Sequence, residues 1–309
     1  MHALLIVNPH ATSTTERRRD LLAHALAGEI DLTVEHTAAR GHAADLAAKA
    51  AEDRVDLVVV HGGDGTVNEV VNGLLSGGAG ADSPILAIVP GGSTNVFARA
   101  VGVAADPTAA TEQILQALTT ATPPRTVSLG KAGDRYFTFN AGLGIDADVV
   151  ERVEQRRAAG AKVTAALHIR QAVAAWFGSD RKIGHLTLDI PGRDPVTGCH
   201  LVFVSNVDPW TYLGSRPIRT NPGTSAEGGL GVFAALSLHA PAVARMAGQL
   251  LVPHSRKGPH GRRLLRLDDV QSLTVTADEP VGLQLDGDFV GRWSPVQFRS
   301  VPDALRVLV

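Results

Sequence analysis

The predicted fold depends on the stretch Leu-Val-Val-Val-His-Gly-Gly-Asp-Gly-Thr at residues 57–66. Its apolar start, Leu57 to Val60, predicts a buried strand, and the apolar spacing in residues 67–74 predicts a helix directly afterwards. Glycines between a strand and a helix let backbone N–H groups approach an anion, and the helix N-terminus adds about half a positive charge. The loop is therefore suited to bind phosphate groups. The alternative interpretation is a tight turn in which Asp64 caps the helix.

A second glycine loop follows one strand later. The sequence Pro-Gly-Gly-Ser-Thr-Asn at residues 90–95 comes after a predicted strand at Ile85 to Val89 and before a helix that carries Phe97. Ligands of open α/β sheets bind at the carboxyl ends of the strands, so we expect both loops to flank one crevice. Neither loop has the Walker A or the Rossmann pattern. Asp64 would repel a phosphate there unless it holds Mg²⁺ or accepts a proton.

The order of the predicted elements divides the chain into two domains. In the first part, strands alternate with helices, which predicts an α/β domain with a parallel sheet covered on both faces. After residues 121–125, strand-like runs dominate and predict a mainly antiparallel β domain. The first-domain strands are expected at 4–7, 32–34, 57–60 and 85–89, and its helices at 14–26, 42–52, 67–75 and 108–118. Later strands are expected at 136–141, 185–190, 199–205, 231–238, 272–277, 281–285 and 296–299, and later helices at 147–177, interrupted near Gly160, and at 241–251.

Composition narrows the range of partners and compartments. The chain has 309 residues, 19% charged residues and a formal net charge of -2, so it lacks the overall positive field that nucleic-acid binding favours. Its single cysteine, Cys199, leaves no internal disulfide and fits a reducing compartment, which favours a cytoplasmic protein over the alternative of an exported protein without disulfides. No run of about 18 apolar residues predicts a transmembrane helix. Residues 253–263 are basic and rich in glycine and proline, which predicts a mobile loop.

Several motifs together resemble one known family. They are Asn8-Pro9, Gly-Gly-Asp-Gly-Thr at 62–66 with Asn68-Glu69, Pro-Gly-Gly-Ser-Thr-Asn-Val-Phe-Ala-Arg at 90–99, and Leu-Asp-Gly-Asp at 285–288. In order and spacing the chain resembles the diacylglycerol kinase catalytic-domain family, which also holds bacterial lipid kinases, sphingosine kinases and ceramide kinases. The resemblance extends over nearly the whole chain. It implies ATP in a cleft between an α/β nucleotide-binding domain, 1–125 with a return segment at 301–309, and a β-rich lipid-substrate domain, 126–300.

The resemblance also implies roles for individual residues. Residues that match the family's nucleotide contacts are Asn8, Thr37, Gly62, Gly63, Asp64, Gly65, Thr66, Glu69, Gly91, Gly92, Thr94, Asn95 and Arg99. The family's Asp-Gly-Glu motif places a carboxylate near the transferred phosphoryl group, and here it reads Asp286-Gly287-Asp288. Because the second acid is one methylene shorter, Asp286 is the preferred catalytic candidate over Asp288. Whether Asp286 or Asp64 is the catalytic base stays open.

Residues of the second domain match further family features. Asp148 lies where sphingosine kinases recognise the lipid head, although Asp146 and Asp148 also suit a helix N-cap. Glu227 and the backbone of Leu230 match a structural Mg²⁺ site of bacterial relatives. An apolar acceptor pocket, or alternatively ordinary core, is expected around Trp176, Phe177, Trp210, Tyr212 and Leu213. The arginines Arg152, Arg156 and Arg157 are interpreted as a solvated helix face, or else as contacts to nucleotide phosphate or anionic headgroups.

The function expected from these features is an ATP- and Mg²⁺-dependent kinase that phosphorylates a lipid hydroxyl at the membrane surface, most simply that of a diacylglycerol. An NAD kinase shares the Gly-Gly-Asp-Gly-Thr loop, but residues 90–99 favour the lipid branch. A catalytically inactive lipid- or nucleotide-binding regulator is the other alternative. It is suggested by Ser128, which replaces the family's acidic residue in the strand entering the second domain, and by Asp288. Exposed edge strands make a homodimer possible.

Overall fold

The chain forms two compact units in the computed structural model. The described residues are 1–11, 15–80, 82–159, 165–178, 184–251 and 257–309. Unit 1 comprises Met1–Leu129 and Val301–Val309, and unit 2 comprises Gly130–Ser300. The predicted domain boundary lies at the first residue of β5 (Arg125–Ala132), whereas the boundary between the units lies inside that strand. The predicted helix interruption near Gly160 and residues 253–256 of the predicted mobile loop fall outside the described residues.

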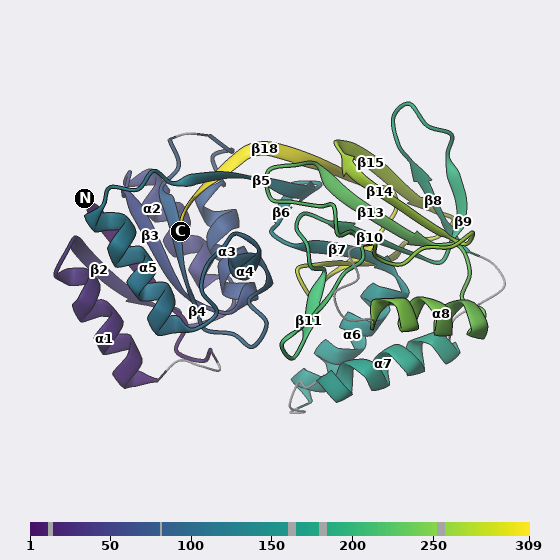
Figure 1. The fold of residues 1–309 in the computed structure, drawn as a ribbon, viewed down its shortest axis with the longest axis horizontal. Helices are drawn as coiled ribbons and strands as arrows, with labels where there is room; N and C mark the ends of the chain where they lie inside the picture. Colours follow the sequence, from purple (N-terminus) through teal and green to yellow (C-terminus); the bar gives the residue numbers. More distant parts are fainter. Residues whose placement is uncertain (12–14, 81, 160–164, 179–183, 252–256) are drawn as a thin grey trace. The chain divides into compact units, whose positions relative to one another are not determined.

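Unit 1 is built on a parallel sheet whose strands lie in the order β2-β1-β3-β4. The strands are β1 (His2–Val7), β2 (Asp31–His36), β3 (Leu57–Gly62) and β4 (Ile85–Pro90), and the end of β18 (Val296–Leu308) pairs in parallel with β4. All six residues of β3 are buried, because helices cover both of its faces. Figure 1 shows this arrangement of sheet and helices.

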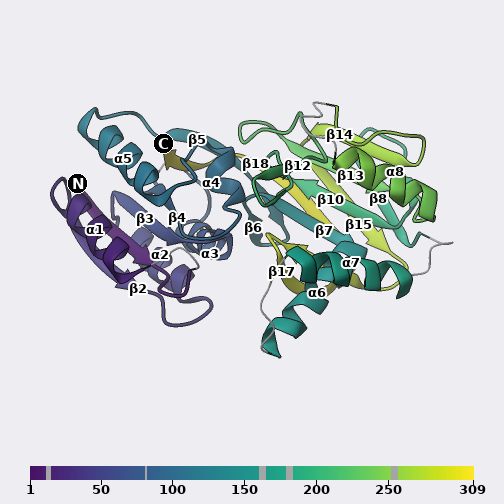
Figure 2. The ribbon, with the colours of Figure 1, turned by 60° about the horizontal axis from the view of Figure 1, so that its bottom comes forward.

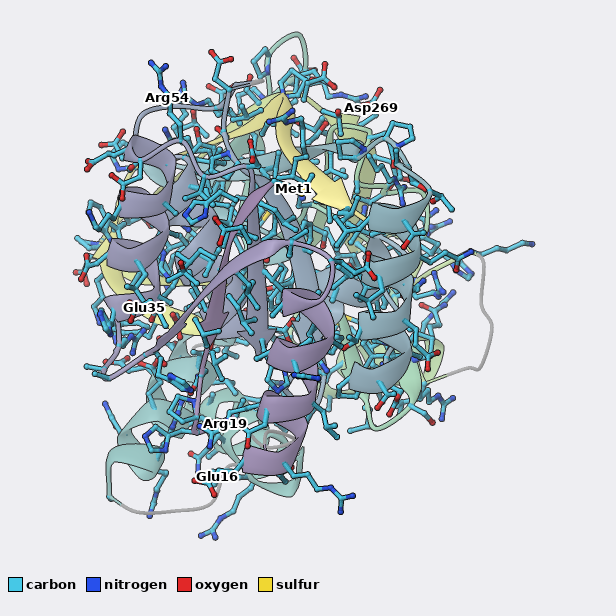
Figure 3. The ribbon with its side chains drawn as sticks, turned by 90° about the vertical axis from the view of Figure 1, so that its left-hand side faces the viewer. Met1, Glu16, Arg19, Glu35, Arg54 and Asp269 are labelled. Atoms are coloured by element: carbon cyan, nitrogen blue, oxygen red, sulfur yellow. The ribbon has the colours of Figure 1, made fainter. Side chains whose placement is uncertain are left out.

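Side-chain alternation along the strands places two helices of unit 1, α1 and α5, on one face of the sheet. The helices are α1 (Glu16–Ala27), α2 (His42–Glu52), α3 (Asp64–Leu74), α4 (Val96–Ala100) and α5 (Pro107–Thr119). Leu5 and Val59 pack with Leu26 of α1 and Ile114 of α5 on one face. Figure 3 shows Glu16 at the end of the unit opposite Arg54; Arg54 precedes β3, so Glu16 lies toward the carboxyl ends of the strands.

Unit 2 contains an antiparallel sheet in the order β14-β13-β10-β7-β16-β17 and a second layer around β15. Strands of the first sheet are β7 (Asn140–Gly144), β10 (Leu201–Ser205), β13 (Leu230–Ala235), β14 (Leu264–Val270), β16 (Val281–Leu285) and β17 (Asp288–Trp293). The second layer contains β6 (Arg135–Phe137), β8 (Leu186–Asp189), β9 (Val196–Cys199), β15 (Ser272–Ala277) and the first part of β18; the short pair β11 (Thr211–Leu213) and β12 (Arg216–Ile218) is separate. Leu143 and Val204 of the first sheet share one core with Leu188 and Phe298 of the second.

Three helices pack on the other face of the six-stranded sheet. They are α6 (Ile145–Ala158), α7 (Ala165–Gly178) and α8 (Ala240–Leu250), and Figure 2 shows α6 and α7 side by side. Phe203 and Phe233 of the sheet form a separate cluster there with Trp176 of α7 and Met246 of α8. No helix among the described residues is long and apolar enough to cross a membrane.

The predicted fold class, a parallel α/β domain followed by a mainly antiparallel β domain, is confirmed. One predicted strand, 136–141, is instead two, because its middle bends between β6 and β7. There the N–H groups of Thr138 and Phe139 donate to the Asp286 side chain rather than to a neighbouring strand. The predicted strand at 199–205 is likewise divided between β9 and β10, and the strand expected at 296–299 extends to Leu308.

Candidate functional site

The two glycine loops lie against each other at the carboxyl ends of β3 and β4. The Gly91 N–H donates to the Gly62 carbonyl over 2.7 Å. A Cβ atom on Gly91 would lie 3.0 Å from the Gly62 Cα, and one on Gly92 would lie 2.9 Å from the Gly63 Cα. Gly63, Gly91 and Gly92 are therefore glycine because the two backbones touch, whereas a Cβ atom on Gly62 would lie 2.7 Å from the Thr66 Cβ in its own loop. The sequence interpretation had attributed these glycines to phosphate binding.

Asp64 joins the first loop to the second. Its Oδ1 accepts the Val96 N–H at 2.7 Å, and its Oδ2 accepts the Thr94 hydroxyl at 2.9 Å. The N-cap of α3 is Gly63, with no side-chain hydrogen bond, so the alternative that Asp64 caps the helix is wrong. A carboxylate has about four acceptor sites, and Asp64 uses at least two of them to hold the second loop.

Two asparagines hold the ends of the loops. The Asn95 side chain accepts from the Gly92 N–H at 2.9 Å and donates to the Gly92 carbonyl at 2.8 Å, while its own backbone adopts a left-handed φ of 48°. Asn8 Nδ2, after β1, donates to the Thr66 hydroxyl at 2.9 Å. Both loops and the end of β1 thus form one hydrogen-bonded frame.

Gly65 differs from the other loop glycines because it faces open space. It is exposed, and an added Cβ would meet no atom within 4 Å. It is the second residue of α3, so its N–H and that of Thr66 belong to the first turn, whose N–H groups lack acceptors within the helix. N–H donors without acceptors in the helix, a positive helix end and a position without a side chain fit a bound phosphate chain.

The remaining predicted nucleotide contacts lie in the same unit. Thr37 follows β2, and its N–H donates to the Val7 carbonyl at 2.9 Å. Glu69 is half-buried on α3, and Arg99 is half-buried on α4. The structure therefore brings Asn8, Thr37 and both glycine loops to the carboxyl ends of neighbouring strands, with Glu69 and Arg99 on the helices that follow.

Asp286 in unit 2 is held by a complete set of hydrogen bonds. Its Oδ2 accepts the Thr138 N–H at 2.6 Å and the Thr138 hydroxyl at 2.7 Å. Its Oδ1 accepts the N–H groups of Phe139 at 2.9 Å and Asn140 at 3.0 Å. Burial raises the pKa of this carboxyl, and the hydrogen bonds from Thr138, Phe139 and Asn140 oppose that rise. With its acceptor sites filled and 6% of the residue exposed, Asp286 fixes the bend between β6 and β7.

Asp288 is the more accessible carboxylate of the same turn. It begins β17, its side chain is 27% exposed, and its Oδ2 lies 3.2 Å from the Arg135 guanidinium. The structure thus favours Asp288 over Asp286 as the group that a substrate reaches, the reverse of the order preferred from the motif. No sequence pattern indicates that the N–H groups of residues 138–140 donate hydrogen bonds to the Asp286 carboxylate.

Gln284 is a site residue that sequence reasoning missed. Its Oε1 accepts the N–H of Gly287, between the two aspartates, at 2.9 Å. Its Nε2 donates to Asn140 Oδ1 at 3.0 Å and to Asp146 Oδ2 at 2.9 Å. Burial raises the pKa of Asp146 to about 7, the Gln284 hydrogen bond lowers it, and Asp148 raises it further. A glutamine within an apolar strand, Val-Gly-Leu-Gln-Leu, was the available signal.

Asp148 lies on the first turn of α6 with its side chain 39% exposed. Burial raises its pKa, and Arg292, whose guanidinium lies 3.8 Å away, opposes that rise. Gly144 is the N-cap of α6 and makes no side-chain hydrogen bond, so the N-cap alternative for Asp146 and Asp148 is wrong. Asp148 therefore remains open to a polar ligand.

The predicted acceptor-pocket residues differ in their surroundings. Trp176 belongs to the core, where its Nε1 donates to the Leu238 carbonyl at 2.9 Å. Trp210 packs on Phe203 with ring centroids 4.7 Å apart, and its buried Nε1 has no hydrogen-bond partner among the described residues. Tyr212 is half-buried and Leu213 is 39% exposed on β11, while the Phe177 side chain lies outside the described part of the chain. Because its buried Nε1 donor is unpaired, Trp210 is the best-supported of these candidates for the acceptor pocket.

Other predicted features are spread over the two units. Glu227 is exposed before β13, Leu230 is buried at its start, and no cluster of three or more His, Cys, Asp or Glu side chains suited to a metal occurs in the described residues. A cation at Glu227 would therefore depend on backbone carbonyls and water. Ser128 is buried in β5, and Arg152, Arg156 and Arg157 are exposed on α6. Cys199 is buried, which raises its thiol pKa to about 11.

Most of the first unit is similar to a known protein family. Residues 2–125 match the model of the diacylglycerol kinase catalytic domain. Over this segment the chain is similar to that family. The match contains both glycine loops with Asp64 and Gly65, and it contains Asn8 and Asn95. It therefore confirms the sequence resemblance over the segment that carries the predicted nucleotide-binding residues.

Individual relatives agree with the family model. The protein named "probable lipid kinase YegS-like" of Chromohalobacter salexigens is 37% identical over 145 residues, 47% of this chain and 44% of that protein. The diacylglycerol kinase of Bacillus subtilis (strain 168) is 38% identical over 150 residues, 46% of this chain and 45% of its own length. The chain thus spans less than half the length of these two relatives. The crystal structure of a diacylglycerol kinase from Bacillus anthracis str. Sterne covers 99% of this chain and 96% of its own with a TM-score of 0.72 at 22% identity, which shows a shared fold.

Proposed function

We propose that the protein is an ATP- and Mg²⁺-dependent lipid kinase that phosphorylates the hydroxyl of a diacylglycerol-type lipid. The observation that supports this most strongly is the exposed first turn of α3 at Gly65, framed by two glycine loops in a segment that matches the diacylglycerol kinase catalytic domain. Phosphoryl transfer requires mainly that the phosphate chain be held and its charge balanced. A rigid set of N–H donors at a helix end meets that requirement.

Residues of unit 1 would bind the nucleotide. The N–H groups of Gly65 and Thr66 would bind phosphate oxygens, and the frame made by Asp64 and Asn95 would keep those donors in place. Arg99 would add positive charge, while Asn8, Thr37 and Glu69 would contact the nucleoside. Bound Mg²⁺ neutralises phosphate charge, and Asp64, whose carboxylate lies between the two glycine loops, is the residue suited to hold it.

Residues of unit 2 would bind and deprotonate the acceptor. Asp288 would accept the proton of the lipid hydroxyl, and Asp286 would hold the turn that carries Asp288. Asp148 would hydrogen-bond the polar head of the lipid, and the unpaired Nε1 of Trp210 would donate to an oxygen of the same ligand. Glu227 with the Leu230 carbonyl would hold a separate structural Mg²⁺.

The test is transfer of label from γ-labelled ATP to a total lipid extract, with and without Mg²⁺, followed by identification of the product. The proposal predicts a labelled phospholipid in the organic phase only when Mg²⁺ is present, and Asp288→Asn as a nearly inactive control. Label on added NAD instead would establish the NAD kinase alternative. Nucleotide binding without label on any acceptor would establish the inactive regulator.

A further inference from the structure

Helix α8 is unusual because it is apolar on nearly all sides yet has no fully buried residue. Val243 and Met246 pack on the Phe233 cluster of the sheet. The opposite side carries the exposed residues Pro241, Ala244, Arg245 and Gly248, and Leu251, just past the helix, is 46% exposed. A helix that is apolar all round is normally enclosed, so its outer side indicates a surface made for an apolar or interfacial environment.

The sequence around α8 is strongly cationic. Residues 228–267 contain no aspartate or glutamate but six Lys and Arg residues, although the whole chain has a net charge of -2. Five of the six are described: Arg245, Lys257, Arg262, Arg263 and Arg266. Charges elsewhere form ion pairs, as between Glu16 and Arg19 of α1, which Figure 3 labels. No ion pair between described residues involves Arg245, Lys257 or Arg262.

Hydrogen bonds attach these cations to both ends of α8. Before the helix, the Arg263 guanidinium donates to the Ser237 hydroxyl at 3.1 Å. Near its end, Gln249 Oε1 accepts the His260 N–H at 3.1 Å, which ties the segment between Lys257 and Arg262 to the helix. Along β14, Leu264 packs in the same cluster as α8, and alternation places Arg266, which donates to the Lys257 carbonyl, on that side of the sheet.

We propose that this α8 face, consisting of Pro241, Ala244, Arg245, Gly248, Leu251, Lys257, Arg262 and Arg266, docks on an anionic phospholipid bilayer. The inference rests on the proposed function, because a kinase with a lipid acceptor must reach the bilayer surface. An interfacial helix with small and apolar outer residues, flanked by cations, gains both from apolar insertion and from the negative lipid headgroups. A symmetric dimer through this face would place the cations against each other, which disfavours a second copy as the occupant.

The test is flotation of the purified full chain with phosphatidylcholine vesicles with and without phosphatidylglycerol. The wild type is expected to float with the anionic vesicles and to be released on raising salt from about 0.1 M to about 0.5 M. Each cation near such a membrane contributes about 5-fold in partitioning, so Arg245→Gln/Lys257→Gln/Arg262→Gln is expected to bind on the order of 100-fold more weakly. Leu251→Asp should also weaken binding without removing a cation.

A matched control removes three exposed arginines from another helix of the same unit. Arg152→Gln/Arg156→Gln/Arg157→Gln on α6 changes the net charge equally and is expected to bind vesicles like the wild type. Circular dichroism and Tm show whether each variant folds, and all substituted side chains are exposed. Equal loss in both triple variants, or wild-type binding by the α8-face triple variant, would overturn the inference. So would a change from dimer to monomer in that variant without a change in vesicle binding.

Activity on two forms of the lipid separates docking from catalysis. With a diacylglycerol in non-ionic detergent micelles, the α8-face triple variant is expected to have the wild-type rate, whereas on anionic vesicles its rate should fall with its binding. Wild-type protein that binds anionic vesicles through this face but phosphorylates no lipid in either form would refute the proposed function while leaving the docking surface supported. Equal rates for the variant and the wild type on anionic vesicles would refute the docking surface alone.

Discussion

Asp286 and Asp288 lie two positions apart in one turn, yet their surroundings indicate a structural role for Asp286 and a catalytic role for Asp288. Asp286→Asn should place an amide NH₂ or a single carbonyl oxygen against the donors of Thr138, Phe139 and Asn140, and so lower the free energy of unfolding by on the order of 3 kcal/mol. Asp288→Asn should leave stability within about 0.5 kcal/mol but lower kcat by about 10² to 10⁴. Urea unfolding and the lipid kinase assay measure both effects. A fully stable, inactive Asp286→Asn beside an active Asp288→Asn would restore Asp286 as the base.

At the scale of elements, the glycines of the two loops can be separated by substitution. Gly65→Ala adds a Cβ to open space at the start of α3, so we expect unchanged stability but ATP affinity lower by about tenfold or more, because the methyl group occupies the phosphate cradle. Gly91→Ala forces a Cβ to within 3.0 Å of the Gly62 Cα and should instead destabilise the unit by about 1–3 kcal/mol. Calorimetric ATP titration and thermal unfolding distinguish the two. If Gly65→Ala binds ATP like the wild type, the cradle at α3 is not the phosphate site.

Individual elements also show which parts of the fold can be predicted from the sequence. Strong periodicity and glycine punctuation predicted β3, α2 and the order of both domains, since one face or both faces of each element are buried. The bend between β6 and β7 could not be predicted, because the Thr138 N–H donates to the side chain of Asp286, which lies 148 residues away in the sequence. Likewise, the local pattern predicts glycine loops but cannot reveal that Gly62 and Gly91 touch. Both features depend on contacts between residues that are distant in sequence, and local sequence patterns do not contain such contacts.

For the whole molecule, the Asp146 carboxyl makes stability depend on pH. Its pKa rises from 3.8 in the unfolded chain to about 7 in the fold, so the folded state binds a proton that the unfolded state has lost between those values. Its contribution is therefore complete below about pH 4 and is lost as pH rises through about 7. Asp146→Asn, which keeps an acceptor for Gln284, should gain on the order of 4 kcal/mol relative to the wild type between pH 4 and pH 8.

Urea unfolding of both proteins across this range measures that difference. Asp194→Asn, at an exposed carboxylate in the same unit, is the control and should run parallel to the wild type. Parallel curves for Asp146→Asn as well would show that the Asp146 carboxyl titrates at its ordinary value in the folded protein.

A crystal structure with Mg²⁺ and a non-hydrolysable ATP analogue tests the proposed nucleotide site most directly. We expect phosphate oxygens within hydrogen-bond distance of the Gly65 and Thr66 N–H groups, at the start of α3, with Asp64 on the side of the metal. An analogue bound elsewhere, or a first turn of α3 covered by the protein's own side chains, would contradict it.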